Sequence, residues 1–571
     1  MKKLPIICPK PKDIEFGDGY FNIEPNSIKI NELGLPVSPD ISLVQNSDFG
    51  EEEYHLEIGD FGIKIMSKND KGAKLGFQTL RQLLIQGELP HLIIRDCPDL
   101  ATRGFMLDIS RCKVPTMETL AYLVDTLSLL KYNRLELYTE HTYAFSKHPL
   151  VWANASPMTK PEYEALDKLC KRAGIELVAN INSLGHMERW LRYDFYKVLA
   201  ESKAPFVDPM GNTRQFPTTL YPDDTAVSFI NSLYSEFLPL FSSNKVNIGC
   251  DEPWELGMGR SKERCEADGS KYKLYVEYVT KLNNLAKTYG KKASIWADVI
   301  IKDKESVKTL PADLGLVLWG YDSDHPFGTQ CQYLQSIGRE YLVAAGTNTW
   351  NSFVGRWQTA HENNNNACKN AKEYGASGAI LTNWGDNGNH QIFSAMFLSI
   401  CNFAQSAWGE LSTQSEAIDA ASALIYRDES KNFAKAIVAL SNSDPHKSLY
   451  SLTNKLFFGT AQEVQKIIEE NPMAMIKMLQ ACDEAFNLLK LSSPKSIDAK
   501  ICIAELNLAI EMQRWAVNRA VNDVAVNNIQ QQIGLKFIRS KYEQIWFARA
   551  RIGGLAESSM RISKIREDIF I

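Results

Sequence analysis

The 571-residue sequence has little net charge, no long apolar run and no paired cysteine motif. A formal charge of −5 over this length gives no attraction for nucleic acid or an anionic membrane surface, so we expect neither as a partner. No apolar stretch approaches the roughly 20 residues that a membrane span needs. The eleven cysteines include no CxxC pair, and their odd number cannot form a complete disulfide set. We therefore expect reduced, mostly buried thiols and no metal site.

Two further absences concern location and class. The N-terminus starts like a secretion signal, but its apolar stretch is short and is interrupted by Pro5 and Pro9, which predicts a cytoplasmic protein. No glycine-rich phosphate turn follows any early strand. An open, doubly wound nucleotide-binding sheet is therefore the less favoured of two α/β architectures.

The chain is longer than one hydrophobic core usually organises, and its pattern changes twice. Residues 1–100 alternate strand-like runs such as 54–58 and 62–66 with turns, followed by a helical stretch at 73–84, which predicts an α+β accessory domain. In residues 411–571 strand signals nearly vanish, which predicts a helical domain. Its amphipathic stripes do not distinguish bracing the neighbouring domain, covering a cleft and forming a homodimer contact.

The middle zone, residues 101–410, contains eight short apolar runs separated by amphipathic helical segments. Parallel strands need helical crossovers and are covered on both faces, so this count predicts a closed (β/α)8 TIM barrel of the α/β class. One helix start is explicit at Thr159, with Pro161 in the first turn and Glu162 at capping-box spacing. The four asparagines at 363–366 are expected to form a loop tip. The eight runs are 105–109, 134–138, 176–181, 246–250, 293–297, 314–319, 341–345 and 379–383.

Two adjacent acids, Asp251 and Glu252, follow the fourth run. Barrel chemistry takes place at the carboxyl ends of the strands, so this position is where catalytic groups are expected. Neighbouring residues on a regular strand point to opposite faces, and both acids reach one cavity only if the strand ends there. Pro253 supports that ending, because proline cannot continue a central ladder.

Paired acids indicate cleavage of a glycosidic bond, in which one acid protonates the leaving oxygen. In well-known retaining barrel enzymes the seventh strand ends in a nucleophilic glutamate, but here residues 344–351 contain no carboxylate. A retaining enzyme of this kind would take its nucleophile from the substrate. A 2-acetamido group can act so, with its carbonyl oxygen attacking the anomeric carbon while the second acid orients the amide N–H.

Motifs at four strand ends and two in the N-terminal zone carry a family resemblance. They are residues 103–111, 185–186, 249–252 and 384–386, with 76–83 and 96–98 in the N-terminal zone. In this order they resemble the signature of glycoside hydrolase family 20, the β-N-acetylhexosaminidases, over roughly residues 50–400. The resemblance implies an exo-acting, retaining enzyme that removes a terminal β-linked N-acetylhexosamine from a carbohydrate substrate, without metal or organic cofactor.

The resemblance assigns roles to the polar residues of these motifs. Glu252 is the general acid/base and Asp251 the acid that orients the acetamide. Arg103 binds hydroxyls of the terminal sugar, where a guanidinium holds two oxygens at once, or else forms a structural ion pair. His186 lies near the two acids and tunes their charge, or else is a structural histidine. Glu140 supports the catalytic pair, or is a solvated loop acid.

The remaining expectations concern the sugar pocket. Trp384 and Trp319 are expected to form an apolar wall for the sugar, and Trp350 is an even choice between wall and core. Asp386 stands where the family usually has a glutamate for the distal hydroxyls, so it is one methylene shorter.

The seventh strand lacks the family's acetamide-activating tyrosine, and Asn351 or Tyr321 would have to donate instead. Two alternatives to the exo-enzyme are a related substrate-assisted glycosidase with endo action or a modified-sugar preference, and a silent sugar-binding barrel. Retention of both acids disfavours silence. The sequence does not distinguish gluco from galacto substrates.

Overall fold

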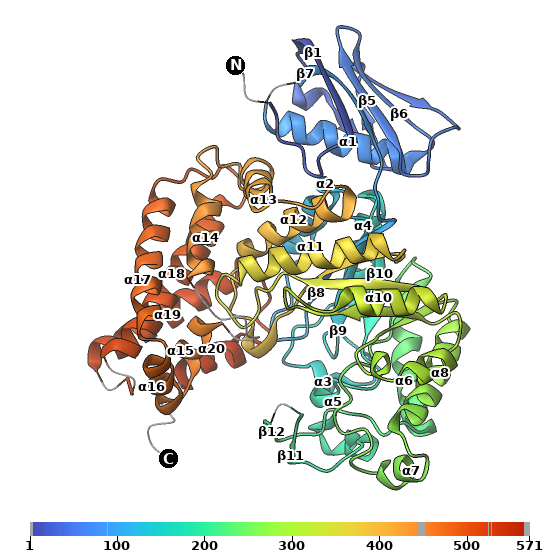
Figure 1. Ribbon diagram of the computed structural model, residues 1–571, viewed down its shortest axis with the longest axis vertical. Helices are drawn as coiled ribbons and strands as arrows, with labels where there is room; N and C mark the ends of the chain where they lie inside the picture. The colour runs from blue at the N-terminus through green and yellow to red at the C-terminus, as the bar shows by residue number, and fades with distance from the viewer. Residues whose placement is uncertain are drawn as a thin grey trace.

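The computed structural model describes residues 4–564 except 88, 210, 444–450, 523, 524 and 527. Figure 1 shows three bodies: an N-terminal sheet domain above one end of a barrel, and a helical C-terminal domain beside the barrel. None of the helices in the described ranges is both long and apolar enough to cross a bilayer.

The central body is the predicted barrel, and all eight apolar runs form its strands. Every neighbouring pair is parallel, and the closed order is β10-β13-β14-β15-β16-β17-β8-β9. The fold-class prediction is therefore confirmed. The strands are β8 (Thr102–Asp108), β9 (Arg134–Thr139), β10 (Glu176–Ile181), β13 (Lys245–Asn247), β14 (Lys292–Trp296), β15 (Gly315–Trp319), β16 (Tyr341–Gly346) and β17 (Gly378–Asn383).

Helices between the strands cover the barrel from outside. Helix α4 begins with the predicted capping box, in which the Glu162 carboxylate accepts the Thr159 backbone N–H at 2.8 Å. The main covering helices are α2 (Met117–Leu129), α4 (Lys160–Arg172), α6 (Asp224–Phe237), α8 (Lys271–Thr288), α10 (Phe327–Ser336), α11 (Trp357–Glu373) and α12 (Met396–Trp408).

The asparagine tract 363–366 lies inside helix α11, so the expected loop tip is wrong. Asn363 and Asn364 are fully buried. The Asn363 side chain accepts the Gly346 N–H at 3.0 Å and donates to the Gly320 carbonyl at 3.0 Å. The tract thus uses its amides to satisfy backbone groups where β15 and β16 end, a function that a polar loop would not serve.

The N-terminal domain is a five-stranded sheet, in the order β1-β7-β5-β6-β4, with helix α1 (Asp70–Ile85) packed against it. The predicted strands at 54–58 and 62–66 are the antiparallel pair β5 and β6. The sheet strands are β1 (Asp13–Phe21), β4 (Ile41–Gln45), β5 (Tyr54–Gly59), β6 (Gly62–Ser67) and β7 (Leu89–Asp96).

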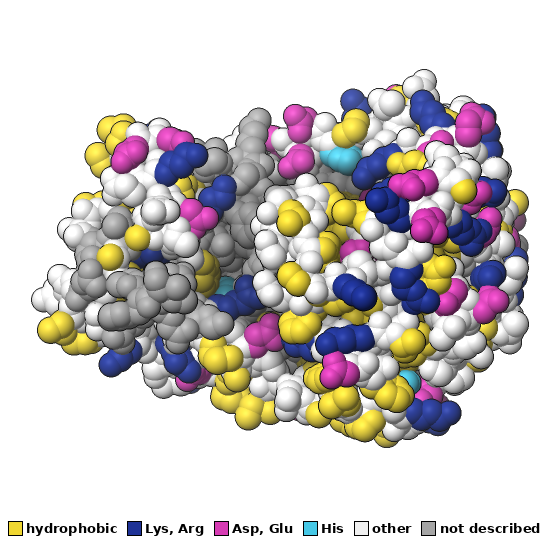
Figure 2. Space-filling view, turned by 90° about the horizontal axis from the view of Figure 1, so that it is seen from below, with side chains coloured by type: hydrophobic (Ala, Val, Ile, Leu, Met, Phe, Trp, Pro, Cys, Tyr) yellow, Lys and Arg dark blue, Asp and Glu magenta, His cyan; other side chains and the backbone are white. Residues whose placement is uncertain are grey.

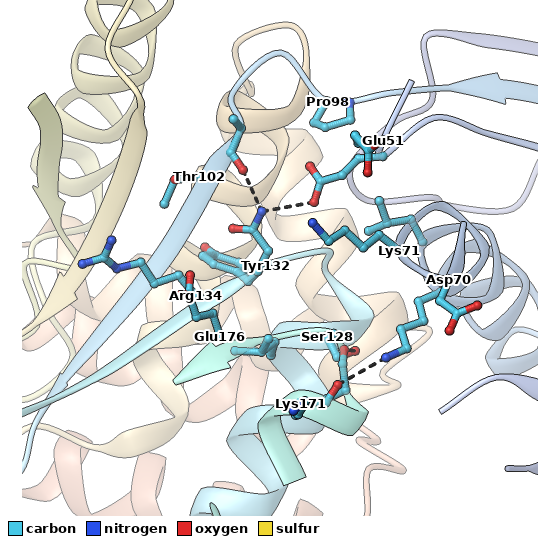
Figure 3. Close-up of a pocket in the computed structure, with 18 of the residues that line it drawn as sticks. Glu51, Asp70, Lys71, Pro98, Thr102, Ser128, Tyr132, Arg134, Lys171 and Glu176 are labelled. Carbon is cyan, nitrogen blue, oxygen red and sulfur yellow. Dashed lines mark hydrogen bonds between the residues drawn. The ribbon is translucent and has the colours of Figure 1, made fainter. Parts of the chain in front are cut away.

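A polar cleft of 1160 Å³ lies between the N-terminal domain and the amino ends of the barrel strands. Figure 3 shows Lys71 of α1 reaching into it, and Arg134 and Glu176 line it at the starts of β9 and β10. The cleft is therefore at the end of the barrel opposite the carboxyl ends of the strands.

The C-terminal domain consists of helices, as predicted. The helices from residue 414 onward are α13 (Gln414–Ala420), α14 (Asn432–Asn442), α15 (Leu452–Phe458), α16 (Ala461–Glu470), α17 (Pro472–Lys490), α18 (Ala499–Asn522), α19 (Ile529–Trp546) and α20 (Leu555–Lys564).

Candidate active site

The two predicted acids lie just beyond the end of the fourth barrel strand. Strand β13 ends at Asn247, and the backbone turns into the left-handed region at Cys250 (φ 70°) and Glu252 (φ 44°). Because the regular strand has ended, the side chains of Asp251 and Glu252 can both face the same group, as the sequence analysis required, and both contact His186. Gly185 lies against this turn, and a Cβ there would be 2.0 Å from the Asp251 carbonyl oxygen. Only glycine fits at Gly185, which explains its place beside His186.

His186 joins the two acids. Its Nε2 is 3.1 Å from Asp251 Oδ2 and 3.4 Å from Glu252 Oε2. Burial opposes the imidazolium, but the charge of Asp251 and hydrogen bonds to both acids outweigh it and raise the pKa of His186 well above its usual value. The site therefore holds a cation between its two acids.

Arg111 occupies the position at which the sequence analysis had placed Arg103. Its guanidinium lies 3.1 Å from Asp108 and 3.3 Å from Glu140, and 3.3 Å from the Nδ1 of His186. Burial opposes its charge, yet the surrounding anionic groups raise its pKa well above the usual value. Glu140 is thus a buried member of the site rather than a solvated loop acid.

Arg103 does not lie in the site, and the expectation for it is corrected. It lies at the amino end of β8, five residues before the site-facing end, and its side chain is 2% exposed. The guanidinium pairs with both carboxylate oxygens of Glu52, at 2.8 and 3.1 Å, and donates to the carbonyls of Lys131 and Leu100. Arg103 therefore joins the N-terminal domain to the barrel, as the structural alternative stated.

Asp298 is a third carboxylate beside the acid pair, and the sequence analysis missed it. Its Oδ2 accepts the backbone N–H of Glu252 at 3.2 Å, and its Oδ1 accepts the Trp319 Nε1–H at 3.4 Å. Burial, followed by the charges of Asp251 and Glu252, raises the pKa of Asp298 from 3.8 to about 7. Its position two residues beyond β14 was the signal that could have identified it.

A cluster of aromatic rings lies beside these polar groups, with the Trp384 ring close to the Arg111 guanidinium. The Trp384 and Trp296 ring centroids are 6.0 Å apart, and Trp384 also contacts Tyr138 at 4.7 Å. Tyr321 stacks on Trp319 at 5.2 Å and meets the edge of Trp350 at 5.0 Å. The structure thus brings the three tryptophans considered in the sequence analysis into one cluster and adds Trp296.

Tyr321 and Asn351, the two candidates for an acetamide donor, have different surroundings. The Tyr321 hydroxyl accepts the Trp384 Nε1–H at 2.7 Å, which leaves its own proton for another acceptor. Gly346 makes room for this ring, because a Cβ there would be 2.8 Å from Tyr321 Cδ1. The Asn351 Oδ1 accepts from Asn387 at 2.9 Å, while its buried Nδ2 has no hydrogen-bond partner in the described ranges.

Asp386 follows β17 at the far side of the cavity. Burial first, and then the neighbouring Asp108 and Glu252, raise its pKa from 3.8 to about 6, while the Arg111 guanidinium counteracts part of that rise. Its position beyond β17, close to Arg111, suits contacts to a ligand's hydroxyls.

The arrangement brings the acid pair, the cationic groups of Arg111 and His186 and a cluster of aromatic rings together at the carboxyl ends of the barrel strands. In Figure 2, the face with the carboxyl ends of the barrel strands is toward the viewer, and acidic and basic side chains are interspersed among the residues in colour. The carboxyl groups of the site outnumber the Arg111 and His186 cations, which disfavours a polyanion, and the tryptophan faces suit a neutral, amphipathic ligand.

Comparisons with known families and proteins agree with this geometry. The family model described as glycosyl hydrolase family 20, catalytic domain, matches residues 101–422, and that described as domain 2 of the same family matches residues 25–97. Among solved structures, a GH20 exo β-N-acetylglucosaminidase from Vibrio harveyi with N-acetylglucosamine has a TM-score of 0.61 at 16% identity, over 73% of this chain and 76% of that one. That likeness shows the fold.

Two curated relatives match at low identity. The lacto-N-biosidase of Bifidobacterium bifidum is 24% identical over 66% of this chain and 35% of that protein. The β-hexosaminidase subunit A1 of Dictyostelium discoideum is 26% identical over 35% of this chain and 39% of that protein. The matches thus span between a third and two fifths of these relatives. The catalytic-domain match covers more than half of this sequence, and the chain belongs to glycoside hydrolase family 20.

Proposed function

We propose that the chain is an exo-acting, retaining β-N-acetylhexosaminidase that uses the substrate's own 2-acetamido group as nucleophile. The observation that carries the proposal is the state of the Asp251 carboxylate. Its Oδ2 is held by His186 at 3.1 Å, whereas the buried Oδ1 has no hydrogen-bond partner among the described residues. A buried acceptor without a donor is costly, so this oxygen is suited to a donor that arrives with the substrate. The acetamide N–H is such a donor.

Glu252 is placed to handle the proton. Its side chain is 29% exposed, against 8% for Asp251, so it lies nearer the mouth of the cavity, where a leaving group departs. In the first step the acetamide oxygen bonds to the anomeric carbon, the glycosidic C–O bond breaks and Glu252 gives its proton to the departing oxygen. In the second step Glu252 takes a proton from water while the water oxygen bonds to the anomeric carbon. The bond between that carbon and the acetamide oxygen breaks, which opens the oxazolinium ring and restores the original configuration.

The other groups hold the sugar for this reaction. Arg111 and Asp386 would bind hydroxyls away from the scissile bond, and the tryptophan cluster would cover the apolar face and the acetamide methyl. Tyr321 would donate to the acetamide oxygen and favour its attack. All eleven cysteines are free thiols, which supports the further proposal of a reducing, cytoplasmic location.

A panel of aryl glycosides that differ only at C2 and C4 tests the proposal. We expect turnover of the 2-acetamido substrates, almost none of the 2-hydroxyl substrates, and inhibition by a thiazoline mimic of the cyclised acetamide. The C4 pair separates gluco from galacto preference. Equal turnover of 2-acetamido and 2-hydroxyl substrates, or a sugar found ester-linked to an enzyme carboxylate, would contradict the mechanism.

Glu252→Gln tests the acid. The rate should fall about two to four orders of magnitude on substrates with poor leaving groups and much less on activated aryl glycosides, because only the former need protonation.

A lacto-N-bioside belongs in the panel as well, because one relative is named a lacto-N-biosidase and Asp386 is shorter than the usual glutamate. Faster release of the disaccharide than of the monosaccharide would favour the modified-substrate alternative.

A further inference from the structure

The last part of the C-terminal domain contacts three of the loops at the carboxyl ends of the barrel strands, and each of these three loops carries one group of the proposed pocket. The loop after β8 carries Arg111, the loop after β10 carries His186, and the turn after β17 carries Asp386. The contacts come from residues 549–561, which lead into and include most of α20. We propose that this segment, the α20 clamp, is a positioning element that holds the three loops so that their side chains face one substrate. The inference rests on the proposed function and extends it.

The clamp joins the first loop through backbone groups. The Thr116 N–H donates to the Arg549 carbonyl at 3.0 Å, and the Arg551 N–H donates to the Val114 carbonyl at 2.9 Å. At Gly554, where φ is +77°, a Cβ would lie 1.8 Å from the Cys112 carbonyl oxygen. The segment therefore lies directly against the residues that follow Arg111.

The second loop is held by an ion pair. Glu557 accepts from both terminal nitrogens of Arg189, at 2.8 and 2.9 Å, and Arg189 lies three residues beyond His186. The pair is partly buried, with the Arg189 side chain 22% exposed and that of Glu557 39% exposed. A bidentate pair fixes orientation as well as distance, so it constrains the short helix α5 (Glu188–Leu191) that begins after His186.

The third loop depends on the clamp most. Asn387, Gly388 and Asn389 all have left-handed backbone, with φ of 56°, 106° and 56°. Such a turn does not make the backbone hydrogen bonds that hold neighbouring strands together. The fully buried Ser558 hydroxyl donates to the Gly388 carbonyl, and the Ser558 carbonyl lies 3.1 Å from His390 Nε2. The turn immediately after Asp386 is thus held by α20.

A partly buried lysine connects the first and third loops beneath C-terminal aromatic rings. Lys113 Nζ donates to the Asn389 carbonyl at 2.9 Å and lies 4.8 Å from the centre of the Trp546 ring and 5.8 Å from that of Tyr542. The rings stabilise a cation that links two site loops and would otherwise be poorly solvated. The clamp and helix α19 therefore act on the same joint.

The same domain interface contains a comparable ion pair whose carboxylate lies outside the three site loops. Arg551 pairs with Glu162 at 2.8 Å, and the two side chains are 17% and 28% exposed. Glu162 belongs to the start of α4, on the outside of the barrel. This pair resembles the Arg189–Glu557 pair in geometry and burial. If the interface only braced the two domains, both pairs would be equally important. If the clamp positions the site loops, only the Arg189–Glu557 pair matters for catalysis.

The test compares Glu557→Gln and Ser558→Ala with Glu162→Gln in the full chain, measuring kcat and KM on an aryl N-acetylhexosaminide. We expect each clamp variant to lower kcat/KM roughly tenfold through displaced loops, and Glu162→Gln to match the wild type. Ser558→Ala should act mainly on KM through Asp386. In an Asp386→Asn background it should therefore add less than about a twofold further loss, because the group it positions has been removed.

Two results would overturn the proposal. One is unchanged kcat/KM in both clamp variants while they remain folded; the other is a Ser558→Ala effect that multiplies fully with Asp386→Asn. Amide hydrogen exchange provides a readout without substrate: Ser558→Ala should speed exchange at residues 387–390 but not in strand β8. Faster exchange spread across the barrel would indicate general destabilisation and refute the clamp. If the wild type cleaves no N-acetylhexosaminide, the proposed function fails, and the exchange result still shows whether α20 holds the turn.

Discussion

Replacing Asp298 by asparagine is expected to stabilise the folded barrel in neutral and alkaline solution. Burial, with Asp251 and Glu252 next to it, raises the pKa of Asp298 from 3.8 to about 7 in the folded chain. Below about pH 4 the carboxyl is protonated in both states and costs nothing. Between about pH 4 and pH 7 the unfolded chain has lost the proton while the folded chain keeps it, so the folded state progressively loses stability as the pH rises through this range. The penalty is complete above about pH 7.

The size of the effect follows from the pKa difference. About three pKa units correspond to roughly 4 kcal/mol at 1.36 kcal/mol each. The residue is only partly buried, so water screens part of that energy, and about 2 kcal/mol is a reasonable expectation. For a barrel of about 300 residues this is a rise in Tm of about 3 °C.

Thermal unfolding of wild type and Asp298→Asn at about pH 8 and about pH 5 measures the difference. The gain should be large at the higher pH and should shrink at the lower one. Asp322→Asn makes the same charge change at an exposed side chain and should shift Tm little at either pH. An equal gain at both pH values, or none at about pH 8, would refute the reasoning, because the asparagine would then act through packing rather than through the charge.

Three further predictions concern the sugar pocket. Arg111→Lys should raise KM about tenfold or more, because lysine cannot hold two oxygens in one plane. Arg103→Met should leave KM unchanged but lower the unfolding free energy by about 3 kcal/mol, because it leaves the Glu52 carboxylate without its ion-pair partner. Tyr321→Phe should lower kcat by about 10²–10³ if its hydroxyl activates the acetamide, and steady-state kinetics showing wild-type kcat would exclude that role. With the pKa of Asp386 at about 6, KM should rise as the pH falls below 6, when the carboxyl gains a proton and ceases to accept two hydroxyls. KM profiles of Asp386→Asn should lack this dependence.

The sequence predicted the barrel well because each strand is a short apolar run closed off by a helix. It predicted the acid pair for the same reason, since Asp251 and Glu252 directly follow a run. The error at Arg103 has a physical cause: it and Arg111 flank the same strand β8, and strand direction puts only Arg111 at the carboxyl end. The rule used for the acids would have selected Arg111 had it been applied here too.

Other features depend on contacts that local pattern does not contain. The Arg189–Glu557 pair spans 368 positions, and nothing near either residue marks the other. The asparagine tract has the composition of a loop, yet it is buried in a helix. Hydrogen bonds from its amides to the strand ends offset the cost of burying these polar groups. The pKa of Asp298 depends on the convergence of two loops and the end of strand β15, so it could be obtained only from the folded structure.

The left-handed backbone at the catalytic turn has a practical implication for engineering. His186, Cys250 and Glu252 have φ of 57°, 70° and 44°, where residues with a side chain pay on the order of 1 kcal/mol that glycine does not. A library selected for heat resistance alone would be enriched in glycine at these three positions. Such variants would gain thermal stability but lose hydrolase activity. Any such campaign on this chain has to score turnover alongside melting.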